Sequence, residues 1–133
     1  MTTKKFTMSK LVRDKTPENL TSEGVKIKWI PCKNQSELLY YYKKKIVEEA
    51  IEVKETQTRQ ELLEEVSDCL EVIDGLLALM KIEKSEIEEV KKNKYKKRGA
   101  FKKGFIIDSI EIPENSPWID YFQKDPLKYP ESS

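Results

Sequence analysis

The chain has 133 residues, the size of one ordinary domain, of which 37% are charged and 38% are hydrophobic. So few apolar residues favour elongated helices with one apolar stripe over a thick β-sandwich. The formal net charge of +1 does not favour nucleic-acid binding by the chain as a whole. The absence of histidine excludes Ser-His-Asp triads, His-ligated zinc and Glu-x-x-His di-iron sites.

Two features predict where the protein works. Its two cysteines, Cys32 and Cys69, form no C-x-x-C pair, which is typical of a reduced, intracellular protein. The first ten residues are polar, and the longest apolar run, residues 76–80, is far too short to span a bilayer. We therefore expect a cytoplasmic protein without a membrane partner, formed by a single domain over residues 1–133 with an extended tail from about residue 113.

A short helix and a strand are predicted before the first long helix. Pro17 suits the first turn of a helix that continues to Leu20 and is broken by Gly24. Residues 25–30 alternate between apolar and polar side chains, which predicts a half-buried strand that ends at Pro31.

Two long helices are predicted next. Apolar residues recur at helical spacing from residue 38 to about residue 55, with Ser36 as the expected N-cap. Thr58 can cap the following helix, and Glu61 is placed to complete a capping box. Gly75 inside that helix costs roughly 1 kcal/mol relative to alanine, which close packing against a neighbouring helix would explain.

A third helix and a second strand complete the expected fold. Ser85 can cap a helix with an acidic first turn and a basic last turn, and Gly99 is expected to end it. Residues 105–112 alternate like a strand. The predicted fold is mainly α, an antiparallel helical bundle with a small strand pair formed by residues 25–30 and 105–112.

Four acidic residues on the two long helices form the most informative pattern. Glu49 precedes Glu52 by three positions and Glu65 precedes Asp68 by three, so each pair shares one helix face. Both motifs are symmetric about a turn at residues 58–59, so an antiparallel hairpin brings them level. Glu49 and Glu65 also interrupt the apolar stripes of their helices, which predicts that they face inward. Carboxylates clustered in this way repel one another unless a cation such as Mg²⁺ or Mn²⁺ is bound. The alternative is that they are ordinary exposed helix charges, as we expect for the other glutamates.

The acidic pattern and two further segments resemble the all-α nucleoside triphosphate pyrophosphohydrolases. Residues 10–17, Lys-Leu-Val-Arg-Asp-Lys-Thr-Pro, are similar to the K-L-V-R-D-K-I-P opening of the MazG-like branch. Residues 97–101, Lys-Arg-Gly-Ala-Phe, are similar to its K-x-x-R-G-x-F stretch after the third helix. Thr16 and Ala100 depart from the usual isoleucine and glycine, and neither is an expected ligand. Dimeric dUTPases and phosphoribosyl-ATP pyrophosphohydrolases belong to the same group.

The resemblance implies a reaction and a set of residues. Mg²⁺ or Mn²⁺ would assist water in converting a non-standard or surplus nucleoside triphosphate to the monophosphate and pyrophosphate. The implied metal ligands are Glu49, Glu52, Glu65 and Asp68. The implied phosphate contacts are Arg13, Lys15, Lys94, Lys97 and Arg98. Glu48 is our candidate for the catalytic base because of its proximity alone. A homodimer or homotetramer is expected to complete the bundle, since the chain supplies only about three of the four helices that enclose such a site.

Two other functions stay open at this stage. One is phosphoribosyl-ATP hydrolysis, and the other is a non-catalytic helical adaptor that binds a partner through its basic face. The presence of all four acidic residues argues against the adaptor. Nucleic-acid binding by the basic run, residues 91–98, is not expected because it holds a single aromatic residue, Tyr95, and no interleaved aromatic series for base stacking. The sequence does not indicate which base and sugar are selected.

Overall fold

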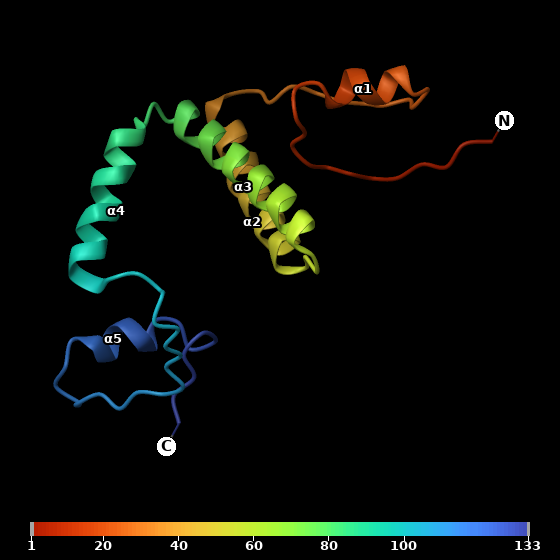
Figure 1. Ribbon diagram of the computed structural model, residues 1–133. Coiled ribbons are helices and arrows are strands. Elements are labelled where there is room, and N and C mark those ends of the chain that lie inside the picture. The colour runs from red at the N-terminus through yellow and green to blue at the C-terminus, as the bar shows by residue number, and fades with distance from the viewer. Residues whose placement is uncertain (1, 133) are drawn as a thin grey trace. The chain divides into compact units, whose positions relative to one another are not determined.

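A computed structural model describes residues 2–132 of the chain, which contain five α-helices (Figure 1). The helices are α1 (Thr16–Ser22), α2 (Gln35–Lys54), α3 (Arg59–Leu79), α4 (Lys84–Arg98) and α5 (Trp118–Gln123). The chain divides into two compact units, with the boundary between Asn93 and Lys94. No helix among residues 2–132 combines the length and the apolar character needed to cross a membrane.

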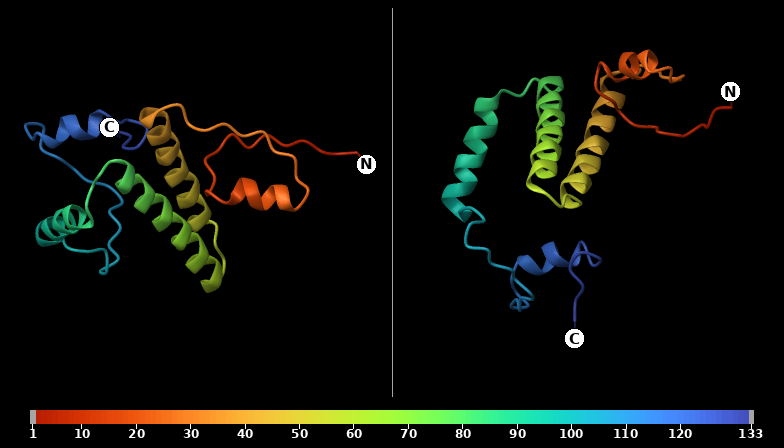
Figure 2. Two further views of the ribbon diagram at one scale, coloured as in Figure 1. Left: turned by 90° about the horizontal axis from the view of Figure 1, so that it is seen from above. Right: turned by 45° about the vertical axis from the view of Figure 1, so that its right-hand side comes forward.

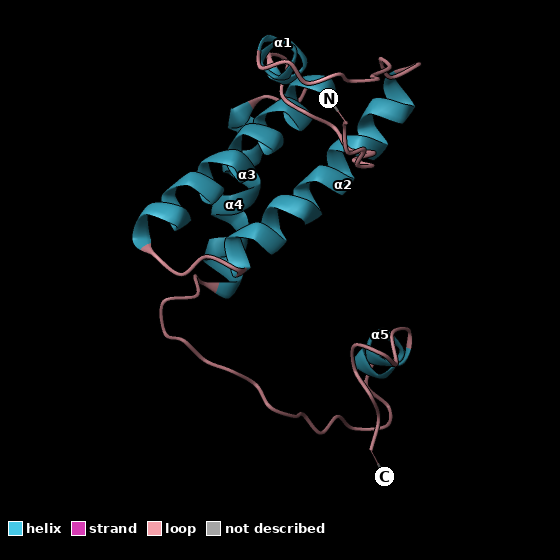
Figure 3. Ribbon diagram, turned by 90° about the vertical axis from the view of Figure 1, so that its right-hand side faces the viewer, coloured by secondary structure: helices cyan, strands magenta, loops and turns pink. Residues whose placement is uncertain are grey.

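Helices α2 and α3 form the predicted antiparallel hairpin, and they lie side by side in all views (Figures 1, 2 and 3). The turn is where the capping pattern placed it, because Thr58 accepts a hydrogen bond from the backbone N–H of Glu61 at 3.1 Å. The Glu61 carboxylate in turn accepts from the backbone N–H of Gln57 at 2.8 Å. The expected N-cap of α2 was wrong: Asn34, and not Ser36, accepts from the N–H of Glu37, so the helix begins earlier at Gln35.

The predicted strand pair was also wrong, since no strand occurs among residues 2–132. An alternating pattern becomes a strand only where a second strand pairs with it. The two candidate segments, residues 25–30 and 105–112, belong to different compact units. Their apolar side chains are largely exposed, for example Trp29 at 65% and Ile106 at 92%, so neither segment has the buried face that specifies a strand.

The inner face of the hairpin carries the acidic residues as the sequence predicted. On α2 the less exposed positions recur at helical spacing and include Glu49 and Glu52, and on α3 they include Glu65 and Asp68. Glu64, in contrast, is exposed. The predicted inward direction of Glu49 is therefore confirmed, and Glu65, Glu52 and Asp68 are partly buried. The apolar side chains of Leu62, Val66 and Leu70 on α3 are exposed.

Close packing at Gly75 brings the two helices together. A Cβ atom added to Gly75 would lie 2.6 Å from Tyr42 Oη and 2.7 Å from Tyr42 Cε1. The Tyr42 ring of α2 therefore occupies the space that any larger residue on α3 would need. This contact gives the reason for a glycine inside a long helix that we had expected from the sequence.

Gly75→Ala should lower the melting temperature even though alanine is the better helix former. The gain in helix propensity is about 1 kcal/mol, while overpacking against an aromatic ring costs about 1–3 kcal/mol. Because Tyr42 is half-buried, its ring cannot move away without losing contacts. Thermal unfolding followed by circular dichroism measures the change, with Gln60→Ala at an exposed position of α3 as the control. A melting temperature for Gly75→Ala above that of the control variant would contradict this packing.

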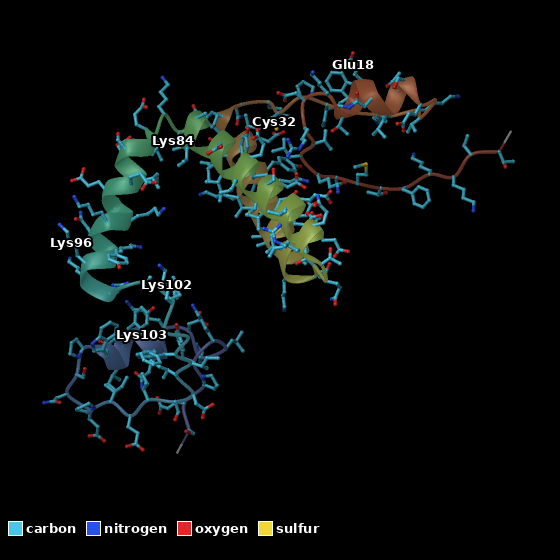
Figure 4. All side chains as sticks on the ribbon, in the orientation of Figure 1. Glu18, Cys32, Lys84, Lys96, Lys102 and Lys103 are labelled. Atoms are coloured by element: carbon cyan, nitrogen blue, oxygen red, sulfur yellow. The ribbon has the colours of Figure 1, made fainter. Side chains whose placement is uncertain are left out.

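The unit that begins at Lys94 contains the end of α4 and the short helix α5. Helix α4 ends as predicted, since Gly99 has a φ of +75° and its N–H donates to the Tyr95 carbonyl at 2.8 Å. Lys84 and Lys96 mark the first and last turns of α4, and their side chains project from the helix (Figure 4). Helix α5 lies in the segment that was expected to be an extended tail. The aromatic rings of this helix, Trp118, Tyr121 and Phe122, pack on one another, and Tyr129 beyond the helix packs on Phe122.

Candidate metal centre

Glu49 is the only buried residue among those that the structure describes, with 5% of its surface exposed. No apolar side chain among residues 2–132 is buried to the same degree. Burying a carboxylate is costly unless it is paired, so the most buried position of a helix hairpin ordinarily holds an apolar residue. The Glu49 carboxylate is paired on one side only, since Lys45 Nζ lies 3.4 Å from its Oε1 atom while Oε2 has no hydrogen-bond partner.

Three of the four predicted ligands come together across the hairpin. One carboxylate oxygen from each of Glu49, Glu65 and Asp68 lies within 4.8 Å of the other two. The Oε2 atoms of Glu49 and Glu65 are buried and have no hydrogen-bond partner. Buried polar atoms are nearly always hydrogen-bonded, so two unpartnered oxygens in one cluster are free to contact a cation. This donor set of carboxylate oxygens fits a hard divalent cation such as Mg²⁺ or Mn²⁺.

The fourth predicted ligand, Glu52, lies beside this cluster and is not one of the three. Burial raises the pKa of Glu49 above its ordinary value, and the neighbouring Glu52 carboxylate raises it further. The ion pair with Lys45 acts in the opposite direction. Two carboxylates this close cannot both ionise readily without a cation. Glu52 thus contributes negative charge next to Glu49.

Glu48, our candidate for the base, faces two lysines. Its Oε1 atom accepts hydrogen bonds from Lys10 Nζ at 3.0 Å and from Lys45 Nζ at 3.2 Å. Partial burial favours the neutral form of Glu48, but the two lysines outweigh it and lower its pKa. The carboxylate is therefore ionised at neutral pH, as a base must be, but its lowered pKa weakens it as a proton acceptor. Its catalytic role stays a prediction.

Arg13, an expected phosphate contact, lies next to the acidic cluster. Its guanidinium Nη2 donates to Asp68 Oδ1 at 2.7 Å, and 59% of its side chain is exposed. The positive charge of the Arg13 guanidinium therefore lies next to Asp68, on a side chain that is mostly exposed to solvent. Lys15 is the N-cap residue of α1 and is exposed.

The remaining expected phosphate contacts belong to the other compact unit. Lys94, Lys97 and Arg98 are exposed on the last two turns of α4, where positive charge complements the helix dipole. Their role in phosphate binding stays a prediction.

Lys45 and Lys10 are charged neighbours of the site that were not predicted from the sequence. Lys45 lies three residues before Glu48 and four before Glu49, a spacing that pairs side chains on a helix and could have revealed it. Lys10 lies in the segment that resembles the MazG-like opening, but its partner Glu48 is 38 residues away and could not be read from local spacing.

The three carboxylates of α2 and α3 could hold a divalent cation between the two helices, beside the basic side chains of Lys45 and Arg13. Comparison of the chain with protein-family models, with curated proteins and with solved structures found no match in any of the three.

Proposed function

We propose that the protein is a Mg²⁺- or Mn²⁺-dependent nucleotide pyrophosphohydrolase, which converts a nucleoside triphosphate to the monophosphate and pyrophosphate. The observation that carries the proposal is the buried, unpartnered Oε2 atom of Glu49, next to the equally unpartnered Oε2 atom of Glu65. Ordinary exposed helix charges would not place a carboxylate at the most buried position of the hairpin.

Each group of residues near the cluster would have a separate role in binding the cation or the triphosphate. Glu49, Glu65 and Asp68 would hold the cation, with Glu52 adding negative charge beside them. A bound divalent cation supplies charge neutralisation for the triphosphate and lowers the pKa of water. Arg13 is close enough to the cluster to contact a phosphate that reaches it, and an arginine fork suits phosphate oxygens. An open groove beside Glu48, lined in part by Tyr41, offers an aromatic ring next to the site.

The exposed apolar residues of the hairpin support a homodimer or homotetramer as part of this proposal. Along α3 the apolar side chains between 39% and 55% exposed are those of Leu62, Leu63, Val66 and Leu70. Contiguous apolar surface of this kind is typical of a protein interface. A second hairpin packed on this stripe would complete a four-helix bundle. Light scattering from the purified chain measures the oligomeric state directly.

The decisive experiment is pyrophosphate release from a panel of nucleoside triphosphates and phosphoribosyl-ATP. We expect release with Mg²⁺ or Mn²⁺ and none with a chelator, because the carboxylate cluster has no other means of binding a triphosphate. The monophosphate should appear in equal amount, which chromatography of the products measures.

Release of inorganic phosphate in place of pyrophosphate would contradict the proposed bond cleavage. A chain that binds Mn²⁺ but hydrolyses none of the panel would favour the non-catalytic adaptor.

A further inference from the structure

Lys45 is held between two carboxylates of its own helix and is one of the less exposed lysines near the site. Its Nζ atom lies 3.2 Å from Glu48 Oε1 and 3.4 Å from Glu49 Oε1, and only 15% of its side chain is exposed. Lys10, which shares Glu48, is 40% exposed, and Arg13 on Asp68 is 59% exposed. Of these three cations, Lys45 is therefore the most firmly enclosed and the only one paired with Glu49.

The two oxygens of Glu49 have different surroundings. Oε1 is paired with Lys45, whereas Oε2 is buried without any hydrogen-bond partner. A lysine that fixes one oxygen of a carboxylate also fixes the direction of the other. In metal sites, groups that contact a ligating carboxylate without touching the metal orient that carboxylate toward the metal.

We propose that Lys45 is a positioning residue, which holds Oε1 of Glu49 so that Oε2 is directed at a divalent cation bound by Glu49, Glu65 and Asp68. The inference rests on the proposed function, because it assumes that the acidic cluster binds a cation. It assigns a role to a residue that makes no contact with the cation itself.

The sign of the effect distinguishes positioning from simple charge. A positive charge near a cation site repels the cation, so removing a lysine should strengthen binding if charge alone matters. Removing a group that orients a ligand weakens binding, typically by about 10- to 100-fold. If Lys45 orients Glu49, its removal should therefore lower the affinity for the cation, whereas if only its charge matters, its removal should raise that affinity.

The test is titration of Mn²⁺ into the metal-free full-length chain, followed by electron paramagnetic resonance of the free ion. We expect Lys45→Met to weaken Mn²⁺ binding by about 10- to 100-fold. Lys45→Arg restores a cation and should bind Mn²⁺ more tightly than Lys45→Met. Two controls remove the same charge nearby: Lys43→Met at an exposed position of α2, and Lys10→Met, which pairs with Glu48 but not with Glu49. Neither control should weaken binding.

Each result decides between the alternatives. Unchanged or tighter Mn²⁺ binding in Lys45→Met would overturn the positioning role and leave the proposed function intact. An absence of Mn²⁺ binding in the unaltered chain would overturn both. Circular dichroism verifies that each variant is folded. If Lys45→Met does not fold, Lys45→Gln provides the same comparison: weaker binding than in the unaltered chain supports the role, and equal or tighter binding overturns it.

Discussion

Glu49→Gln is expected to make the metal-free protein more stable and to abolish metal binding and catalysis. Its carboxylate is buried, lies near Glu52 and has one oxygen without a partner, so the metal-free fold carries the cost of that charge. Glutamine keeps the shape and removes the charge. Lys45 is not left unpaired by the change, because it also pairs with Glu48 at 3.2 Å. A gain of about 1 kcal/mol would raise the melting temperature of a domain this size by roughly 3–6 °C.

The pH dependence of this gain has a definite sign. Burial and the nearby Glu52 raise the pKa of Glu49 in the folded state above its unfolded value. A carboxyl with a raised folded pKa contributes its full stability below the unfolded pKa, and this contribution is lost as the pH rises through the folded pKa. The melting temperatures of the unaltered protein and Glu49→Gln should therefore converge under acidic conditions near pH 4 and separate as the pH approaches neutrality.

Melting curves of the metal-free proteins across this pH range, with and without added Mg²⁺, provide the measurement. Glu71→Gln makes the same substitution at an exposed position of α3 and should change neither the stability nor the metal response. A Glu49→Gln protein that is less stable than the control at neutral pH would mean that the ion pair between Glu49 and Lys45 within α2 outweighs the cost of burying the carboxylate. That result would contradict the proposed cation site.

The hairpin and its acidic face could be predicted because their signals are local. Thr58 and Glu61 define the turn by hydrogen bonds over three and four residues, and the positions of Glu49 and Asp68 relative to that turn fix which residues meet. The helical periodicity of the apolar residues then determines which acidic side chains face the neighbouring helix. The same local logic accounts for Gly75, whose contact with Tyr42 follows from the two helices lying level with each other.

What could not be predicted depends on partners distant in the sequence. Residues 25–30 have the alternation of a strand, but alternation cannot supply a second strand to pair with. The pairing of Arg13 with Asp68 joins residues 55 apart, and no spacing rule covers it. Helix α5 was missed because the prolines around it suggested an extended chain, while the contacts among its aromatic rings depend on how Tyr129 folds back.

Asp68→Asn should remove nearly all pyrophosphohydrolase activity while leaving the metal-free stability close to that of the unaltered protein. Asp68 would supply an oxygen directly to the cation, so we expect a loss beyond the roughly 10- to 100-fold that follows from changing an orienting neighbour. Its only ion pair among the described residues is with Arg13, and both side chains are well exposed, at 39% and 59%. Exposed pairs of this kind contribute at most about 1 kcal/mol, and water can solvate the released guanidinium.

Asp74→Asn is the control for the effect of Asp68→Asn on activity and stability. Asp74 lies on the same helix at an exposed position, so the same chemical change there removes a charge without touching the cluster. Pyrophosphate release and metal-free melting curves should both be unchanged in that control. If Asp68→Asn unfolds at a clearly lower temperature than Asp74→Asn, the Arg13–Asp68 pair holds the N-terminal segment on the hairpin as a structural contact. If it keeps its activity, Asp68 does not bind the cation, and the donor set reduces to the carboxylates whose oxygens are buried and unpartnered, Glu49 and Glu65.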